Sequence, residues 1–223
     1  MTIPPTAIVS ENANIADGVT LGPYSIIGAD VHLAQGVTVG AHASISGPTT
    51  VGADCQIFPY AAVGGDPQDK KYAGEASLLT IGARNIFREF CTINRGTRGE
   101  ATIIGNDNLF MAYSHVAHDA IIGNYCAFAN SANVAGHVVI EDNVVLGGLV
   151  GVHQNCRIGR CAMVGGGGMA AQDVPPFTIA QGDRAKLFGL NIVGLRRRGF
   201  SLEVVSALKG AYRELFHQGL PLR

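Results

Sequence analysis

The chain has 223 residues, of which 47% are hydrophobic and 15% charged, and its formal net charge is −1. This composition excludes a disordered chain, and the balanced charge argues against nucleic acid or an anionic membrane surface as a partner. The longest apolar stretch, residues 144–152, is far short of the ~20 residues that span a bilayer, and the N-terminus shows no signal-peptide pattern.

Aliphatic or aromatic residues recur every six positions over residues 9–63, 81–93 and 104–164, and glycine often follows them directly. A period of six fits neither the 3.6-residue turn of a helix nor the alternation of a strand. It is the signature of a parallel β-helix. We expect one large apolar side chain per hexad to point inward, and glycine to serve the corners that need a positive φ.

Two segments break the period, at about residues 65–80 and 94–103. Each begins and ends at a corner of a coil, so we expect both to loop out while the β-helix continues. Loops on a rigid scaffold often carry function. The first loop is the stronger candidate, because it concentrates charged residues and one aromatic residue.

The hexads end after Val164, and two prolines at 175–176 mark the exit from the β-helix. Residues 187–198 are expected to form a short helix. Residues 201–217 carry apolar groups at helical spacing, with Ser201 as the N-cap. Such a helical end piece would cover the open end of the solenoid.

The repeat pattern resembles the left-handed parallel β-helix of hexapeptide-repeat acyltransferases, in which three hexads form one triangular coil. The predicted fold is therefore all-β: a left-handed parallel β-helix over residues 1–183, with the two loop insertions, and a short helical segment over 184–223. Residues eighteen apart should stack one strand spacing, ~4.8 Å, along the axis.

Stacking by eighteen places His118 below Gly136 and Gln154 on one edge of the prism. His137 and His153 neighbour these positions. An imidazole beside a glycine N–H can perform acyl transfer, because the histidine removes a proton from an attacking hydroxyl and the N–H holds the oxyanion. Asp119 could orient His118, although adjacent strand residues normally face opposite sides.

A zinc site is the alternative, as in β-helical carbonic anhydrases, with His115, His118 and His137 as ligands. No firm ligand spacing supports it. A trimeric scaffold without catalytic activity is a further alternative.

Several strings extend the resemblance beyond the fold: QDKKYAGE at 68–75, HVAHD at 115–119, NVAGH at 133–137, QDVPPF at 172–177 and GLNIVGLRRRGFS at 189–201. They are similar to the cytoplasmic UDP-N-acetylglucosamine acyltransferases that begin lipid A synthesis. The similarity runs in order from about residue 5 to about residue 215.

The resemblance implies transfer of a (3R)-hydroxyacyl group from acyl carrier protein to the glucosamine 3-hydroxyl of UDP-N-acetylglucosamine. It assigns His118 as general base, with Gly136 N–H as oxyanion donor and Asp69 at the sugar and acyl group. The substrate-binding residues that it implies are Gln68, Lys71, Tyr72, His115, His137, His153, Gln154, Asn191, Arg197 and Arg198. Arginine suits bidentate phosphate contact. Gly166 matches a position that measures acyl chain length.

The resemblance further implies a homotrimer with active sites between neighbouring prisms, and a donor carried on the phosphopantetheine of acyl carrier protein, without a separate cofactor or metal. Two departures are visible: Val193 stands where the family often has an acidic residue, and fewer C-terminal helices are predicted than is usual. A 3-amino sugar acceptor stays open as an alternative. The five cysteines form no C-x-x-C pair, so we expect buried thiols in a cytoplasmic protein.

Overall fold

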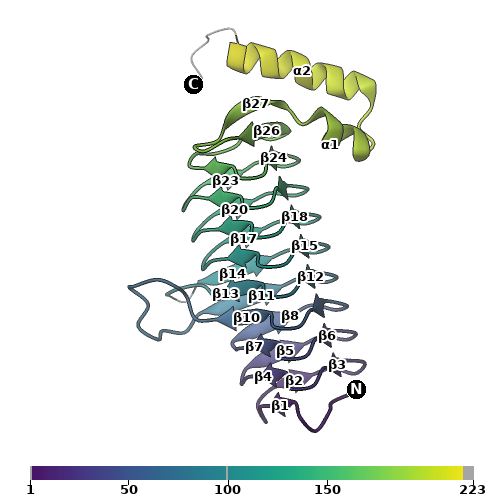
Figure 1. Ribbon diagram of the computed structural model, residues 1–223, viewed down its shortest axis with the longest axis vertical. Helices are drawn as coiled ribbons and strands as arrows, with labels where there is room; N and C mark the ends of the chain where they lie inside the picture. Colours follow the sequence, from purple (N-terminus) through teal and green to yellow (C-terminus); the bar gives the residue numbers. More distant parts are fainter. Residues whose placement is uncertain (1, 99, 218–223) are drawn as a thin grey trace.

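A computed structural model describes residues 2–98 and 100–217. The chain winds into a three-sided prism of stacked coils, with the N-terminus at one end and two helices at the other (Figure 1). Each side of the prism is a sheet of short strands, and consecutive strands along the chain belong to consecutive sheets. This is the predicted left-handed parallel β-helix with a short helical end piece.

The first sheet has nine parallel strands. They are β1 (Ile8–Val9), β4 (Ile26–Ile27), β7 (Ser44–Ile45), β10 (Ala62–Gly65), β13 (Thr92–Asn94), β16 (His115–Val116), β19 (Asn133–Val134), β22 (Gly151–Val152) and β25 (Met169–Ala170).

The second sheet has eight strands and the third has ten. The second contains β2 (Asn14–Ile15), β5 (Val31–Leu33), β8 (Thr49–Val51), β11 (Leu78–Ile81), β14 (Ala101–Ile104), β17 (Ile121–Ile122), β20 (Val139–Ile140) and β23 (Arg157–Ile158). The third contains β3 (Thr20–Leu21), β6 (Thr38–Val39), β9 (Gln56–Ile57), β12 (Ile86–Phe87), β15 (Leu109–Phe110), β18 (Ala127–Phe128), β21 (Val145–Leu146), β24 (Met163–Val164), β26 (Thr178–Gln181) and the antiparallel β27 (Lys186–Leu190).

Strand register confirms the coil length. Ile8 pairs with Ile26, and Ile103 with Ile121, so equivalent residues lie eighteen apart. The inward positions of the hexads form one continuous core, in which almost every predicted side chain is buried. Phe87, Phe110 and Phe128 stack along its axis with ring centroids 4.8 and 4.5 Å apart.

Most of the described glycines that directly follow an inward residue serve a different purpose from the one predicted. Gly64, with a φ of 77°, and the corner glycines Gly18 and Gly36, with φ of 76° and 74°, do supply the predicted positive φ. Gly22, Gly40 and Gly52 do not have positive φ, but a Cβ at each would lie within 2.7 Å of the backbone of the next coil. Positive φ is instead adopted two residues later, by non-glycine residues such as Tyr24 and His42. Glycine is needed here because neighbouring coils approach closely, not because of its backbone freedom.

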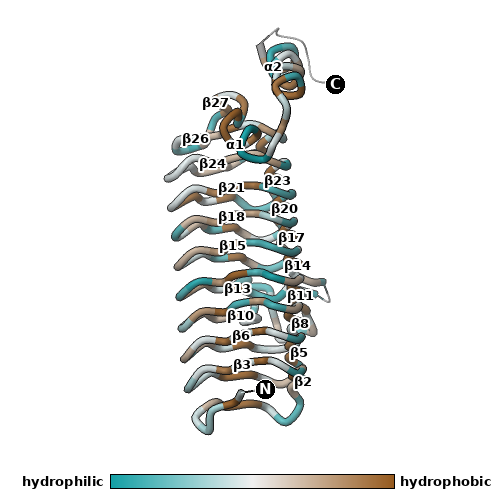
Figure 2. Tube along the Cα trace, turned by 90° about the vertical axis from the view of Figure 1, so that its right-hand side faces the viewer, coloured by the Kyte–Doolittle hydropathy of each residue, from teal (hydrophilic) through white to brown (hydrophobic). Residues whose placement is uncertain are grey.

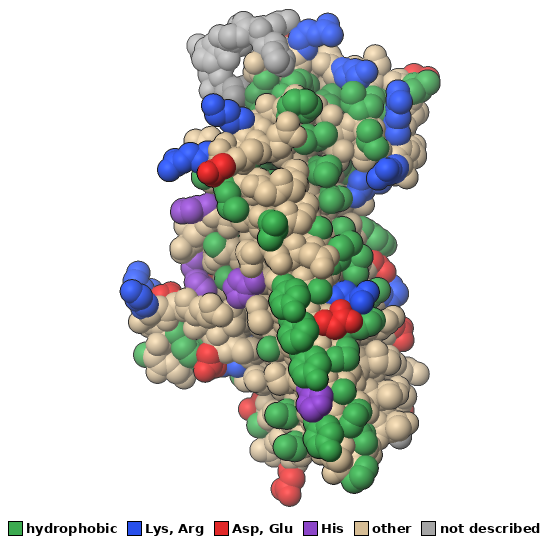
Figure 3. Space-filling view, viewed as in Figure 1, with side chains coloured by type: hydrophobic (Ala, Val, Ile, Leu, Met, Phe, Trp, Pro, Cys, Tyr) green, Lys and Arg blue, Asp and Glu red, His purple; other side chains and the backbone are tan. Residues whose placement is uncertain are grey.

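The three corners of the prism differ, and we name each by its contents. Both loops leave from the loop corner, between the first and second sheets. The asparagine corner, between the second and third sheets, carries a ladder of polar side chains: Asn85, Asn106, Asn108, Asn124 and Asp142. The aromatic corner, between the third and first sheets, stacks Tyr24, His42, Tyr60, Phe90 and Tyr113 at 5.0–5.1 Å spacing. A column of mostly hydrophobic side chains is visible on this face in Figure 3.

The two loops are shorter than the sequence pattern indicates. They comprise residues 66–77 and 95–100, because residues 78–80 and 101–103 already belong to strands β11 and β14. The chain rejoins the second sheet as soon as it can pair: Leu79 pairs with both Thr49 and Thr102.

The C-terminal segment folds over the end of the prism (Figure 2). Residues 187–190, the start of the predicted helix over 187–198, instead belong to strand β27, which pairs antiparallel to β26 and so satisfies the edge of the third sheet. Helices α1 (Ile192–Arg197) and α2 (Leu202–His217) follow. The Ser201 hydroxyl accepts a hydrogen bond from the N–H of Val204, as predicted for the cap of α2. No helix within residues 2–98 and 100–217 has both the length and the hydropathy needed to cross a membrane.

Candidate active site

The loop corner gathers most of the polar residues that the sequence singled out. His118, His137 and Gln154 lie at this corner on successive coils. The first loop leaves the prism at the same corner, nearer its N-terminal end (Figure 1). The N–H of His137 donates to the carbonyl of His118 at 3.1 Å, which is the predicted stacking by eighteen and nineteen residues.

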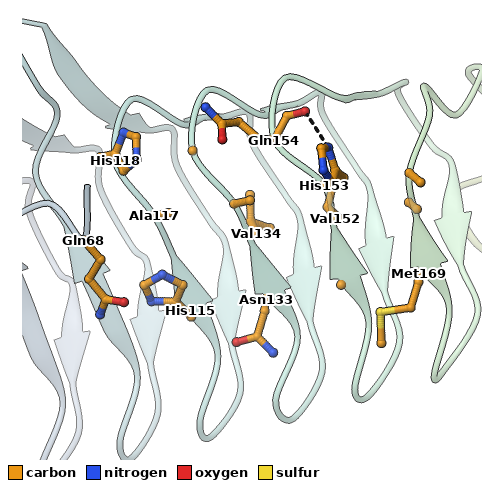
Figure 4. A pocket seen from close by; sticks show the side chains of 15 residues that line it. Gln68, His115, Ala117, His118, Asn133, Val134, Val152, His153, Gln154 and Met169 are labelled. Atoms are coloured by element: carbon orange, nitrogen blue, oxygen red, sulfur yellow. Dashed lines mark hydrogen bonds between the residues drawn. The ribbon is translucent and has the colours of Figure 1, made fainter. Parts of the chain in front are cut away.

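A groove of about 520 Å³ runs from this corner across the outer face of the first sheet. His118, Gly136 and Gln154 line its corner side, and His115, Asn133, Gly151 and Met169 line the strand side, with Gln68 reaching it from the first loop (Figure 4). Apolar groups make up most of the lining. The groove therefore combines one polar edge with an apolar floor.

His118 and Asp119 form a close pair in this corner. His118 Nδ1 lies 2.7 Å from Asp119 Oδ2, and both residues are 7% exposed. Asp119 has a φ of 58°, so its side chain does not alternate away from that of His118 as it would in a strand. Burial raises the pKa of the Asp119 carboxyl, but hydrogen bonds from His118 and Thr97 outweigh burial and hold this pKa below its usual value.

This pairing determines which nitrogen of His118 is available for chemistry. A carboxylate accepts the proton of Nδ1, which leaves Nε2 without a proton and able to act as a base. Nε2 faces Gly136: a Cβ built there would lie 2.7 Å from it. Position 136 therefore has room for glycine only, and its N–H has no hydrogen-bond acceptor among the described residues.

The other histidines have separate environments. His115 bonds through Nδ1 to the Thr92 hydroxyl at 2.7 Å, and burial lowers its pKa below the usual value. The rings of His137 and His118 meet edge to face, and His137 Nε2 is 3.6 Å from Asp119 Oδ2. His153 Nδ1 bonds locally to the carbonyl of Gln154 at 3.1 Å.

The first loop places its residues in two groups. Gln68 lines the groove, whereas Asp69 and Lys71 line a smaller polar pocket of about 220 Å³ together with His137 and Gln154. This pocket adjoins the groove at the loop corner, since His137 and Gln154 belong to that corner. Tyr72 lies apart from both: its hydroxyl accepts a hydrogen bond from Arg95, which also binds Asp66.

The residues assigned to the nucleotide are not part of this site within one chain. Asn191 is 3% exposed and caps α1, accepting from the N–H of Gly194 and donating to the carbonyl of Cys161. Arg198 donates to the carbonyl and the side chain of Asn143. Both partners belong to the asparagine corner, where α1 sits, away from the first loop (Figure 1). Arg197 is exposed on the same helix.

Gly166 lies at the aromatic corner, between β24 and β25, and is not among the residues that line the groove. A Cβ added there would contact only the backbone of Gly148, at 3.4 Å. The fold therefore has room for a side chain at this position.

One group of potential metal ligands occurs among the described residues: His118, Asp119 and His137, whose donor atoms lie within 4.8 Å of one another. It differs from the set that the sequence suggested, because His115 is bonded to Thr92 instead. His118 Nδ1 and Asp119 Oδ2 already bond to each other, and a hydrogen-bonded pair of this kind is the arrangement of a general base and its orienting carboxylate.

Sequence reasoning missed several residues of the site. Asn133, Gly151 and Met169 pair in register with His115 along the first sheet, so counting by eighteen from that histidine would have found them. Thr97, which binds Asp119, could not be found in this way, because the hexad register is broken on both sides of the second loop.

Comparisons with known proteins show the family. The family model described as "Udp N-acetylglucosamine O-acyltransferase; Domain 2" matches residues 173–223, and the model for bacterial transferase hexapeptide repeats matches residues 101–136. The acyl-acyl-carrier-protein–UDP-N-acetylglucosamine O-acyltransferase of Verminephrobacter eiseniae is 56% identical, over 99% of this chain and 85% of that protein. The protein of the same name from Stenotrophomonas maltophilia is 51% identical over the same shares.

Solved structures of UDP-N-acetylglucosamine acyltransferases superpose closely on this chain. The UDP-N-acetylglucosamine O-acyltransferase of Moraxella catarrhalis superposes with a TM-score of 0.96 at 44% identity, over 99% of this chain and 87% of that one. The LpxA structure from Acinetobacter baumannii has a TM-score of 0.95 at 42% identity, over 98% and 85%.

Proposed function

This chain belongs to the family of acyl-acyl-carrier-protein–UDP-N-acetylglucosamine O-acyltransferases, and we propose that it performs the acyl transfer at the loop corner with His118 as general base. The family reaction takes an acyl group from acyl carrier protein to UDP-N-acetylglucosamine and begins lipid A biosynthesis. The donor is a (3R)-hydroxyacyl thioester and the acceptor is the glucosamine 3-hydroxyl.

The observation that carries the proposal is the His118–Asp119 pair, whose imidazole packs against Gly136, a buried residue whose N–H has no acceptor among the described residues. Asp119 holds the proton on Nδ1, so that Nε2 accepts the proton of the attacking 3-hydroxyl. The oxygen then bonds to the thioester carbonyl carbon, and the carbonyl oxygen takes the negative charge. The carbon–sulfur bond breaks next, and the imidazolium of His118 returns its proton to the leaving sulfur.

Gly136 supplies the N–H that stabilises the oxyanion in this scheme. A buried N–H without an internal acceptor is suited to a charge that exists only in the transition state. A Cβ at position 136 would overlap the His118 ring, so glycine lets the imidazole keep its position. Because the thioester already activates the carbonyl carbon, we expect the reaction to need no separate cofactor or metal.

The two cavities suit the two substrates. The apolar floor of the groove, with Met169, Val134 and Val152, suits an acyl chain. The small pocket with Asp69, Lys71, His137 and Gln154 suits the hydroxyl-rich sugar. Gln68, His115 and His153 line the groove between these regions and are proposed to bind substrate.

The nucleotide residues support a trimer. The base lies at the loop corner, whereas Asn191, Arg197 and Arg198 lie at the asparagine corner of the same prism. One bound sugar nucleotide can meet both sets only if the loop corner of one chain faces the asparagine corner of another. A cyclic homotrimer repeats this heterologous contact three times and closes.

We further propose a cytoplasmic location, which suits five buried, unpaired thiols.

The test is an acyl-transfer assay with UDP-N-acetylglucosamine and hydroxyacyl carrier proteins of graded chain length, read by mass spectrometry. We expect an O-acylated sugar nucleotide, and a rate about 10²–10⁴-fold lower for His118→Ala. The matched control is His32→Ala, an exposed histidine on the second sheet. Product only with a 3-amino sugar nucleotide would identify an N-acyltransferase. Unchanged turnover in His118→Ala would contradict the assigned base.

A further inference from the structure

The second loop reaches the catalytic pair through Thr97. We propose that Thr97 is a positioning residue, which fixes the Asp119 carboxylate and through it the imidazole of His118; this rests on the function proposed above. The sequence pattern assigns no specific role to this loop, and Thr97 lies outside the strings that carry the family resemblance.

Thr97 binds both oxygens of the Asp119 carboxylate. Its N–H donates to Oδ1 at 2.8 Å and its hydroxyl donates to Oδ2 at 2.7 Å. The backbone N–H of Asp119 in turn donates to the Thr102 hydroxyl at 2.9 Å. Thr97 is 7% exposed, as is Asp119, so water does not readily replace these bonds. Two bonds to two oxygens fix the plane of the carboxylate, which a single bond could not do.

The orientation matters because Asp119 Oδ2 has two histidines beside it. His118 Nδ1 is 2.7 Å from this oxygen, and His137 Nε2 is 3.6 Å from the same oxygen, with the His137 side chain 38% exposed. A carboxylate free to rotate could bind either ring. The two bonds from Thr97 keep Oδ2 directed at His118, so that its Nδ1 stays protonated and its Nε2 stays basic.

The second loop is shaped to deliver these bonds. Its coil, from Thr92 to the paired His115, is five residues longer than a regular coil. The N–H of Gly96 donates to the Leu78 carbonyl, which ties the loop to the second sheet. A Cβ at Gly96 would lie 2.8 Å from Asp119 Oδ1 and 2.6 Å from the Glu100 carbonyl. Only glycine lets the loop backbone come this close to the carboxylate.

The decisive variants are Thr97→Val, which removes the hydroxyl at nearly constant size, and Thr97→Ser, which keeps it. We expect Thr97→Val to lower kcat roughly ten- to hundredfold, as for the loss of a hydrogen bond to a charged group. Thr97 also lines the small pocket proposed for the sugar, so the KM of the sugar nucleotide should change too, but by much less than kcat. Thr97→Ser should restore most of the rate. Thr20→Val, an exposed threonine on the third sheet, is the control and should match the wild type.

A double-mutant comparison separates positioning from a general structural effect. In a His118→Ala background, Thr97→Val should cause no further loss of rate, because Thr97 acts through that ring. A full additional loss there, a KM that rises as much as kcat falls, or a serine variant as slow as the valine variant would overturn the proposal. Thermal unfolding checks the fold, and Thr97→Cys, a weaker donor of similar size, replaces the valine variant if that variant does not fold.

Nitrogen NMR of the ligand-free protein distinguishes failure of this proposal from failure of the proposed function. The wild type should show His118 protonated at Nδ1, and Thr97→Val should lower the population of that tautomer. An unchanged tautomer population in Thr97→Val would contradict the positioning role, whatever acyl transfer the chain performs.

Discussion

Positions 118 and 119 show how one backbone angle creates the candidate site. Neighbouring residues in a strand face opposite sides, yet the positive φ of Asp119 brings its carboxylate to 2.7 Å from His118. The same corner conformation recurs on successive coils, at His137 and Asn155. Within residues 2–98 and 100–217, Asp119 is the one place where this conformation sets an acid beside a histidine that lines the groove.

The ionisation of Asp119 should make stability depend on pH. The pKa of the Asp119 carboxyl in the folded protein is held below the usual value of about 3.9. Its contribution to the free energy of unfolding is therefore fully present above the usual value, and it is lost as the pH falls through the lower pKa of the folded state. The free energy of unfolding, measured in urea, should therefore fall more steeply for the wild type than for Asp119→Asn as the pH is lowered from about 5 to about 3. Asp17→Asn, an exposed carboxylate, is the control and should follow the wild type. Equal slopes for wild type and Asp119→Asn would contradict the assignment.

Replacing Gly136 by alanine should impair the reaction more than the fold. The added Cβ would lie 2.6 Å from the His118 ring, so the imidazole must move, and we expect kcat to fall about 10²-fold or more. Gly148→Ala is the matched control, because its Cβ would be 3.5 Å from the nearest atom. Steady-state kinetics on both variants measure the difference, and equal rates would exclude a role for position 136.

Gly166→Met tests the proposed measurement of chain length. The fold has room for this side chain, so a stable protein with a preference for shorter acyl donors is expected. Competition between carrier proteins with acyl chains of different length reads the preference directly. An unchanged donor profile would remove Gly166 from the proposed acyl-chain contacts.

At the scale of elements, the asparagine corner shows how a solenoid holds its coils in register. Asn85 donates to the carbonyls of Gly82 and Gly105 and accepts two hydrogen bonds from Asn108. Each side chain thus binds polar groups of its own coil and the next. The ladder satisfies buried corner groups that no strand pairing reaches.

Asn85→Ala should therefore destabilise the fold. The change removes four hydrogen bonds in a buried site and takes away the Asn85 partner of the Gly105 carbonyl and of the Asn108 backbone N–H, which costs about 1–3 kcal/mol. Asn14→Ala, on an exposed strand position, should change the free energy of unfolding by less than about 0.5 kcal/mol. Denaturant unfolding measures both, and similar values for the two would show that the ladder contributes little.

At the scale of the whole molecule, the proposed site is divided between two corners of the prism. The base and both loops belong to the loop corner, and α1 with its arginines belongs to the asparagine corner (Figure 1). Within one chain, the rigid coils keep the loop corner and the asparagine corner apart. In the proposed trimer, a neighbouring prism completes the site.

Mixed trimers test this division. A His118→Ala chain assembled with an Arg197→Ala chain should regain activity, because some interfaces combine an intact loop corner with an intact α1. His118→Ala assembled with Asp119→Asn should not, since both changes affect the same corner. Recovery in neither mixture would place the complete site within one chain.

The period of six by itself predicted a parallel β-helix, because it matches one inward side chain per strand, and the resemblance to hexapeptide-repeat acyltransferases supplied the three-sided, left-handed coil. The sequence also placed His118, Gly136 and Gln154 together, since eighteen residues make one coil wherever the repeat is unbroken. The tertiary structure decided what repetition cannot encode. The contact of Thr97 with Asp119 crosses a break in register, the pairing of His118 with Asp119 depends on a corner φ, and the place of Arg198 depends on how the chain turns after the last coil.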